Sequence, residues 1–516
     1  MADKERLNLI VCGHVDHGKS TGIGHMLFLL GQIHDPKKKR PAWRIAEAYY
    51  KQSRELQMGS WAYAWILDPL IEERERGLTI NIAFMEFQTN KYIYNLIDAP
   101  GHSDFVKNLI TGASQADAAI LMSSARPGEF EDGFKSTGSA GGKYADVIGM
   151  TLEHMLLLTS LGITDIVVAI NKMDTVDWDK KRYETMSGQI KKTFGTLMKA
   201  IRTENVEEKL EQIQFVPTSG LYGVNMLTKD MTLKNLEGHI NAAKTGKADA
   251  GFIESLEKEK AEIERQWPDW YEGPSLIEAL DNLPSPGARK ADLMKKSLRV
   301  PIQSVLSIPG AGTVLTGRIA SGVLKPETTV NVSPTKRSLG LTPITVKTIQ
   351  EFHKDLPQAA PGDNVGIAIK AKNIGPKDII RGSVLSDGDA TKAVESLRPG
   401  VDGFLSLVLV IRSLGKVVKK GAGKAWSIHV DYSPVVHLGT AQTAARVTEI
   451  KNLKGEDMSE LTQNQQGMVW MTPLQPMVVE PLTQTPALGR FALRDSGKTV
   501  AVGIVEKVEK DRYKKE

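Results

Sequence analysis

Residues 7–20, LNLIVCGHVDHGKS, decide the fold of this chain. Their apolar first half stops at Gly13, and residues 13–20 then have the spacing G-x-x-x-x-G-K-S. An apolar run bounded by glycine indicates a buried strand, and the residues after Ser20 have the pattern of a helix. In such a loop the glycines let backbone N–H groups surround phosphates, and the helix N-terminus adds a favourable dipole. The stretch therefore predicts a strand, a phosphate-binding loop and a helix in succession.

The side chains of this loop predict how a nucleoside triphosphate is held. Lys19 is expected to reach the β- and γ-phosphates and to assist catalysis there, and the Ser20 hydroxyl is expected to ligate Mg²⁺. The expected nucleotide contacts within the loop are Gly13, His14, Val15, Asp16, His17, Gly18, Lys19, Ser20 and Thr21.

Further apolar runs continue the pattern along the chain. They lie at 92–97, 118–122, 166–170 and 214–217, with helical patterns such as 149–161 between them. Strands separated by helices imply a mostly parallel sheet, in which ligands bind beyond the carboxyl ends of the strands. Polar or glycine-rich segments follow most of these runs, so the site is expected at that edge of the sheet.

Two segments predict contacts with the metal and the γ-phosphate. Asp98 follows a predicted strand in DAPG, where its carboxylate can hold Mg²⁺ through water and the Gly101 N–H can sense the γ-phosphate. His102 comes next and is the candidate for placing the attacking water, by orientation and charge stabilisation. In EERERGLTI, residues 72–80, Thr79 can complete the metal shell only when the γ-phosphate is present, which makes it a catalytic group and an ordering switch. The alternative for this segment is a charged helix end.

Two later segments predict which base the bound nucleotide carries. A carboxylate at Asp174, in NKMD, can accept hydrogen bonds from N1–H and N2–H₂ of guanine, a donor pair that adenine lacks. Asn171 can bridge loops near the base, and the stem of Lys172 can cover the face of the base. After the last predicted strand, TSG can offer backbone N–H groups to guanine O6, and the expected contacts there are Ser219, Gly220 and Leu221. Together these segments predict that the protein binds GTP rather than ATP.

The character of the sequence changes after PSPG at 284–287, which is typical of a linker. From Ser297 onward, short strand-like runs separated by Gly, Pro and Asp predict all-β structure. About 220 residues are too many for one small barrel, so we divide them near residue 390. The predicted organisation is an α/β P-loop GTPase domain, with a mostly parallel sheet, over 1–290 and two all-β barrel domains over 291–390 and 391–516.

Residues 226–268 are expected to form a helical insertion in the first domain. Apolar residues keep a helical spacing there among many Glu and Lys: Phe252, Leu256, Ile263 and Trp267. This pattern predicts an amphipathic surface helix, and its plainest interpretation is structural packing alone.

Composition narrows the class of protein. Of 516 residues, 41% are hydrophobic and 25% charged, which excludes disorder as the main state. The single cysteine, Cys12, excludes an internal disulfide framework and fits a reducing compartment. A net charge of +5 permits a nucleic-acid partner without requiring one. Because no signal peptide and no apolar run long enough to span a bilayer is present, we expect a cytoplasmic protein without membrane contact.

GHVDHGKS, EERERGLTI, DAPGH, NKMD and TSG together resemble the translational GTPases. LGRFALRD at 488–495 resembles the last domain of archaeal and eukaryotic elongation factor 1-alpha, in the elongation factor Tu superfamily, and residues 312–325 resemble its second domain. The resemblance implies GTP/GDP and Mg²⁺ as ligands, the ribosome as activator, a guanine nucleotide exchange factor as partner and a monomeric chain. It also implies that His102 is the catalytic histidine, set in place by ribosomal RNA. The resemblance leaves the cargo open, because this family carries aminoacyl-tRNA while its close relatives carry peptide release factors or ribosome-rescue factors.

The sequence is compatible with three hypotheses about what this GTPase binds. The short N-terminal segment before the first strand favours an elongation factor that carries aminoacyl-tRNA. Gln350, however, stands where tRNA carriers usually have a Glu that contacts the tRNA 3′ end, and Ala320 also replaces a Glu. These two differences favour a paralogue that carries a peptide release factor or a ribosome-rescue factor. The basic stretch 507–515 is compatible with a third hypothesis, in which the protein is a GTPase that binds the cytoskeleton or another non-ribosomal partner.

Overall fold

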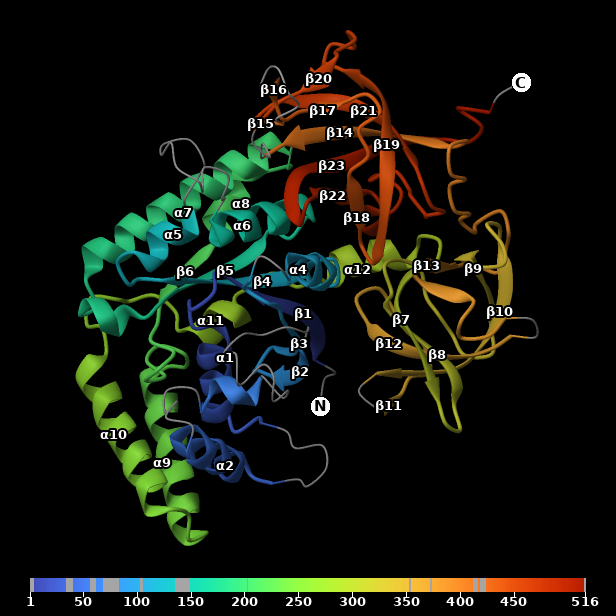
Figure 1. Ribbon diagram of the computed structural model, residues 1–516. Coiled ribbons are helices and arrows are strands. Elements are labelled where there is room, and N and C mark those ends of the chain that lie inside the picture. Colours follow the sequence, from blue (N-terminus) through green and yellow to red (C-terminus); the bar gives the residue numbers. More distant parts are fainter. Residues whose placement is uncertain are drawn as a thin grey trace.

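The computed structural model describes residues 4–33, 40–55, 62–67, 83–102, 105–134, 149–201, 203–351, 354–371, 374–411, 416–417 and 424–514. An α/β domain comes first, and two β-barrels pack beside it (Figure 1).

The α/β domain is built on one six-stranded sheet with the order β2-β3-β1-β4-β5-β6. Its strands are β1 (Glu5–Cys12), β2 (Ala83–Gln88), β3 (Tyr92–Asp98), β4 (Ala118–Ser124), β5 (Asp165–Asn171) and β6 (Gln214–Pro217). All neighbouring pairs are parallel except β2 and β3, which are antiparallel. The mostly parallel sheet predicted from the sequence is therefore confirmed, with β2 as an additional edge strand.

Helices cover both faces of this sheet. They are α1 (Lys19–Leu29), α2 (Ala42–Glu55), α4 (Val106–Ala113), α5 (Glu129–Phe134), α6 (Met150–Ser160), α7 (Lys180–Ala200), α8 (Val206–Gln212), α9 (Lys229–Thr245), α10 (Ala250–Gln266) and α11 (Leu276–Asp281). Because strand side chains alternate between faces, Leu9 and Val11 join one apolar core with α1, while Ile10 and Cys12 join another with α4 and α6. The central strand is thus buried on both sides, which explains its unbroken apolar run.

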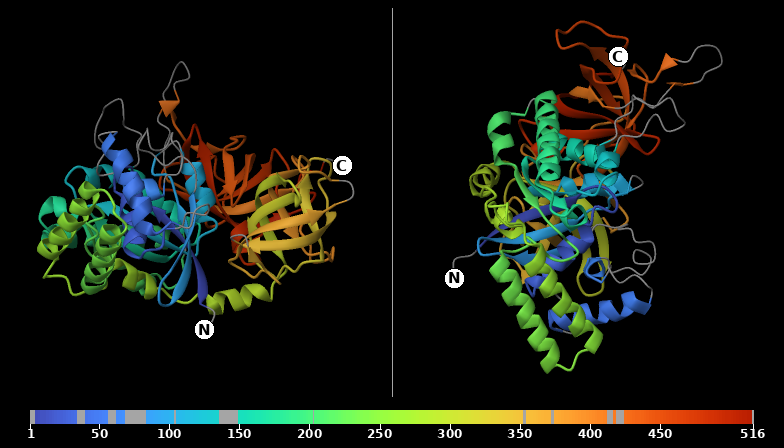
Figure 2. Two further views of the ribbon diagram at one scale, coloured as in Figure 1. Left: turned by 90° about the horizontal axis from the view of Figure 1, so that it is seen from below. Right: turned by 90° about the vertical axis from the view of Figure 1, so that its left-hand side faces the viewer.

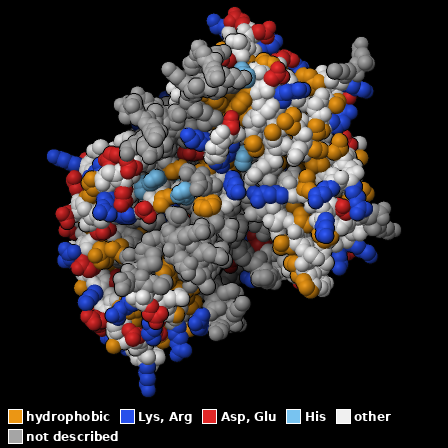
Figure 3. All heavy atoms as spheres, in the orientation of Figure 1, with side chains coloured by type: hydrophobic (Ala, Val, Ile, Leu, Met, Phe, Trp, Pro, Cys, Tyr) orange, Lys and Arg blue, Asp and Glu red, His pale blue; other side chains and the backbone are white. Residues whose placement is uncertain are grey.

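The region 226–268 contains two helices, where the sequence pattern indicated one. α9 and α10 lie side by side next to α2 (Figure 1). Phe252, Leu256 and Ile263 of α10 are buried in the core that contains α1, and Trp267 is partly buried against it. At the lower left of the molecule, where this pair lies, Lys, Arg, Asp and Glu side chains are intermixed on the surface (Figure 3). The pair is therefore part of the domain core on one side and solvated on the other.

The remaining chain forms two closed barrels, as predicted. The first contains β7 (Arg299–Ile308), β8 (Gly312–Arg318), β9 (Thr329–Thr335), β10 (Thr342–Glu351), β12 (Asn364–Lys370) and β13 (Ile379–Ser386), and β11 (Lys354–Asp355) pairs with β10. The second contains β14 (Gly403–Val410), β18 (Val435–Leu438), β19 (Ala441–Lys451), β21 (Gln466–Pro473), β22 (Arg490–Asp495) and β23 (Lys498–Glu509). Short pairs flank it: β15 (Lys416–Val417) with β16 (Lys424–Ala425), and β17 (Ile428–His429) with β20 (Glu460–Leu461). A helix, α12 (Gly287–Met294), begins inside the stretch expected to be a linker.

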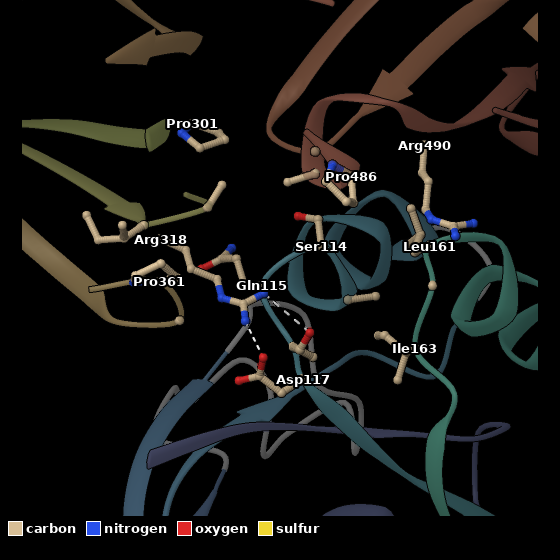
Figure 4. A pocket seen from close by; sticks show the side chains of 18 of the residues that line it. Ser114, Gln115, Asp117, Leu161, Ile163, Pro301, Arg318, Pro361, Pro486 and Arg490 are labelled. Carbon is tan, nitrogen blue, oxygen red and sulfur yellow. Dashed lines mark hydrogen bonds and ion pairs between the residues drawn. The ribbon is translucent and has the colours of Figure 1, made fainter. Parts of the chain in front are cut away.

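Buried ionic contacts join the three domains. Between the barrels, which lie next to each other in Figure 2, the Arg299 guanidinium donates to both carboxylate oxygens of Glu480, at 2.9 and 2.8 Å. Between the first domain and the first barrel, Arg318 pairs with the buried Asp117 (Figure 4). A cavity of about 270 Å³ lies at this junction and is lined by all three domains, including Arg490 from the second barrel. Charged groups that are largely withdrawn from water thus join the first barrel to the first domain and the second barrel to the first barrel.

None of the helices among the described residues combines the length and the apolar character needed to cross a membrane.

Candidate functional site

The loop between β1 and α1 is fitted closely to its neighbours. Gly18 precedes α1 with φ of 80°, and a Cβ there would lie 2.5 Å from the side-chain nitrogen of Asn171. Gly13 has φ of 146°, and a Cβ there would collide with the backbone carbonyl of Met122 on β4. Only glycine fits both positions, so the loop's backbone is pressed between β4 and the end of β5.

The groups expected to contact the γ-phosphate converge on this loop. The Lys19 ammonium donates to the His14 carbonyl at 2.9 Å, which folds its side chain back over the loop. Gly101 lies so close that a Cβ there would collide with the Lys19 ammonium, and it would stand 3.0 Å from the Gly13 carbonyl oxygen. Asp98, at the end of β3, is fully buried, and His102 is half-buried with its ring centroid 6.0 Å from that of Phe105. Ser20 is on the first turn of α1.

Thr79 and the rest of residues 72–80 lie outside the described residues.

Three histidines surround the base of the loop and are kept neutral. Burial lowers the pKa of His17 to about 3, and its ring nitrogens each lie 3.2 Å from a backbone carbonyl. Burial and then the Lys19 ammonium lower the pKa of His14 and, more strongly, of His154 on α6. The Nδ1 atom of His154 accepts the Gly13 N–H at 2.9 Å. His154 could not be predicted from the sequence as part of the site, since nothing in its helical pattern distinguishes it from a core residue.

Asn171 joins the loops that follow β1, β5 and β6. Its amide nitrogen donates to the His17 carbonyl at 2.8 Å, and its amide oxygen accepts the Gly220 N–H at 2.8 Å. The Thr218 hydroxyl donates to the same oxygen at 3.3 Å. Asn171 therefore connects the phosphate loop to the loop expected to contact the base.

Asp174 offers a buried acceptor. It lies in the short helical turn Met173–Val176 that follows β5. Its Oδ1 atom is buried and has no hydrogen-bond donor among the described residues. A buried carboxylate oxygen without a donor is costly, and a ligand that brings N–H groups would satisfy it. The neighbouring Lys172 has φ of 61°, and its ammonium donates to Glu129 at 2.9 Å.

The loop after β6 uses most of its own N–H groups internally. The N–H of Thr218 donates to the Ile170 carbonyl at 2.8 Å, and the N–H of Ser219 donates to the Val224 carbonyl at 3.1 Å. The N–H of Gly220 is bound to Asn171, as described above. Among the described residues, the Leu221 N–H has no acceptor. Leu221 is therefore the residue of this loop whose N–H can donate to a bound base.

The donor set fits Mg²⁺ bound together with a nucleotide. The Asp98 carboxylate and the Ser20 hydroxyl are the oxygen ligands that this ion prefers. Within the described part of the chain, no cluster of three or more His, Cys, Asp or Glu side chains could hold a metal by itself. Phosphate and water oxygens would therefore complete the shell.

Gln350 is not near these loops, because it lies on β10 in the first barrel (Figure 1). Its amide is exposed and donates to Asp355 at 2.9 Å. It borders a cavity of about 340 Å³ that is also lined by Gln115 of the first domain. Ala320 lines the separate cavity at the junction of the three domains.

Comparison with known proteins agrees with this arrangement. The family profile described as "Elongation factor Tu GTP binding domain" matches residues 4–285, "Elongation factor Tu domain 2" matches 312–386, and "GTP-eEF1A C-terminal domain-like" matches 424–506. The chain is 38% identical over 521 residues to elongation factor 1-alpha of Aeropyrum pernix, covering 98% of each chain. It is 39% identical over 519 residues to that of Ignicoccus hospitalis, covering 98% of this chain and 97% of the relative. The S. cerevisiae Ski7 GTPase-like domain, solved with GDP and inorganic phosphate, has a TM-score of 0.65 at 16% identity, covers 97% of each chain and shows the shared fold.

Proposed function

This chain belongs to the elongation factor Tu GTP-binding family, and from that membership we propose that its GTP form delivers aminoacyl-tRNA to the ribosomal A site. It is a translation elongation GTPase, and the proposal concerns its cargo, its site residues and its partners. The observation that carries the proposal is similarity to elongation factor 1-alpha over 98% of the chain, both barrels included.

We assign guanine nucleotide binding to the loops that follow β1, β3, β5 and β6. Asp174 accepts from the base, the Leu221 N–H donates to O6, and Lys19 contacts the β- and γ-phosphates. Ser20 and Thr79 ligate Mg²⁺, and Asp98 holds it through water. The ion, when bound, neutralises charge on the phosphates. Among the described residues, the buried Oδ1 of Asp174 has no donor and the Leu221 N–H has no acceptor, and both support this assignment because they match the donors and the acceptor on one edge of guanine.

We assign hydrolysis to attack of water on the γ-phosphate in line with the leaving oxygen. His102 orients that water, and Lys19 stabilises the charge that develops on the phosphates. The close approach of Gly101 to the Lys19 ammonium supports this, since it brings His102 beside the place of the γ-phosphate. Hydrolysis releases Thr79 and rotates the first domain away from the barrels, so the cargo is released.

A paralogue that carries a release or rescue factor is the second candidate, and Gln350 is the observation that favours it. A neutral amide makes a weaker hydrogen bond to a ribose hydroxyl than a carboxylate does. The Gln350 amide also donates to Asp355, which a tRNA 3′ end would have to displace.

The proposal is tested by the stability of the ester bond in aminoacyl-tRNA. The protein in its GTP form should slow spontaneous hydrolysis of the ester, and the GDP form is the control. Gln350→Glu should keep or increase this protection. Absence of protection in both nucleotide states, with GTP binding intact, would reject the tRNA proposal in favour of the release-factor or rescue-factor paralogue.

The remaining partners follow from the family. We propose the ribosome as the activator of hydrolysis, a separate protein as nucleotide exchange factor, a monomeric chain and a location in the cytoplasm.

A further inference from the structure

His25, on α1, is a buried histidine that the proposed hydrolysis does not use. Its side chain is 0% exposed. Its Nδ1 atom lies 2.9 Å from the Gly220 carbonyl oxygen, and its Nε2 atom lies 3.0 Å from Oε1 of Glu259. Glu259 belongs to α10, within the region 226–268, and it also accepts the Tyr63 hydroxyl at 2.8 Å. The Tyr63 ring stacks on the imidazole, with centroids 3.9 Å apart and planes 12° apart.

Both atoms that face the imidazole are oxygens. Because a carbonyl oxygen can only accept, the bond to Gly220 needs a proton on Nδ1. Glu259 bonds the other ring nitrogen and so holds the ring in the orientation that presents Nδ1–H to this carbonyl. The Gly220 carbonyl is therefore held by a ring that α10 positions.

The Gly220 carbonyl belongs to the same peptide group as the Leu221 N–H. Fixing the carbonyl fixes the direction in which that N–H points, because the peptide group is planar. Accepting a hydrogen bond at the carbonyl also polarises the group and strengthens its N–H as a donor. On the other side of Gly220, its own N–H is held by Asn171 at 2.8 Å. The peptide groups on the two sides of Gly220 are thus held in place, one by His25 of α1 and the other by Asn171 at the end of β5.

From these contacts we propose that Glu259 is a positioning residue for the base: through His25 it orients the Leu221 N–H toward guanine O6. The α9–α10 pair thereby sets how tightly the protein holds GTP and GDP. Glu259 and Leu221 also line the same cavity, of about 360 Å³, between α2, α10 and the loop after β6. The proposal rests on the guanine site proposed above and is independent of the cargo.

The test compares two nucleotides that differ only at the O6 position of guanine. In 6-thioguanosine diphosphate, sulfur replaces O6 as a weaker acceptor, while N1–H and N2–H₂ remain for Asp174. For Glu259→Ala we expect GDP to bind about tenfold more weakly, the effect of losing one hydrogen bond to a buried group. Binding of the thio analogue should change much less, so the preference for GDP over the analogue should shrink. Glu259→Gln, which keeps the shape and one oxygen that can bond the His25 ring, should give an intermediate loss.

Glu262→Ala is the matched control on the same helix. Glu262 borders the same cavity, and its partners are Arg265 and Gln266 of its own helix. This variant should bind both nucleotides as the unaltered protein does. If Glu259→Ala and Glu259→Gln weaken GDP and the thio analogue by equal factors, or change neither, the positioning role is wrong. If the unaltered protein binds neither nucleotide, the guanine site itself is wrong.

Discussion

Exchange of Asp174 for Asn tests the guanine assignment directly. In the structure Oδ1 of Asp174 is buried without a donor among the described residues, so a bound guanine would be its main partner. The amide oxygen of Asn can still accept one N–H, but its NH₂ group then faces the second donor. The change costs at least one hydrogen bond to a charged group and leaves a donor unsatisfied, about 3–4 kcal/mol in all. GTP affinity should therefore fall about 100- to 1,000-fold.

Xanthosine triphosphate should show the opposite change. Xanthine has a carbonyl where guanine has its 2-amino group, so the Asn NH₂ can donate to it. Competition of GTP and xanthosine triphosphate against a fluorescent GDP analogue measures both affinities. Asp177→Asn is the control, because Asp177 lies in the same segment and is exposed. If Asp174→Asn leaves GTP affinity within twofold of the unaltered protein, the carboxylate does not contact the base.

Three further changes test other parts of the reasoning. His102→Ala should bind GTP normally but lose about 100-fold or more of the ribosome-stimulated hydrolysis, measured as phosphate release with saturating ribosomes. Gly18→Ala should abolish tight nucleotide binding by fluorescence titration, because its Cβ would lie 2.5 Å from the Asn171 amide at φ of 80°. His437 is buried, which lowers its pKa to about 3, so an unfolded chain binds more protons than the folded one between that value and about 6.5. The contribution of His437 to the free energy of unfolding should be fully present above pH 6.5 and should decrease on acidification by up to about 1.4 kcal/mol per pH unit. His437→Gln should reduce this pH dependence, which urea unfolding at pH 7 and pH 5 measures.

The sheet was predictable where strands are buried on both faces. β1, β4 and β5 each have helices on both faces of the sheet. Their sequences are therefore short, continuous apolar runs, which are typical of strands buried on both faces. β2 was missed because an edge strand is covered on fewer sides, and its sequence AFMEFQ includes Glu86, which pairs with Arg6 on β1. α9 lies within 226–268, which was expected to be helical, but it was not distinguished as a separate helix because its apolar positions are widely spaced among polar residues, and α2 and α10 bury them.

The loops that carry the proposed site residues could be predicted, because each follows a strand that the sequence indicates, but the hydrogen bonds within those loops could not. TSG was expected to offer N–H groups to the base, whereas in the structure the N–H groups of Thr218, Ser219 and Gly220 donate to acceptors within the protein. Which backbone N–H remains for a ligand depends on partners far along the chain, such as Asn171. His25 and Glu259 are 234 residues apart and have no sequence signal that links them. Spacing identifies loops, but only three-dimensional contacts identify the donors that are left over.

The two halves of the proposed nucleotide site are held by different kinds of contact. On the base side, buried hydrogen bonds through Asn171 and His25 fix backbone groups of the surrounding loops. On the γ-phosphate side, Gly101 meets the loop after β1 through the ammonium at the end of the Lys19 side chain. A flexible side chain can follow the loss of a phosphate, whereas a network of buried backbone contacts cannot rearrange without breaking several bonds at once. Hydrolysis should therefore displace the segment around Gly101 and His102 and leave the guanine loops in place, so that GDP stays bound until another protein disturbs the base side.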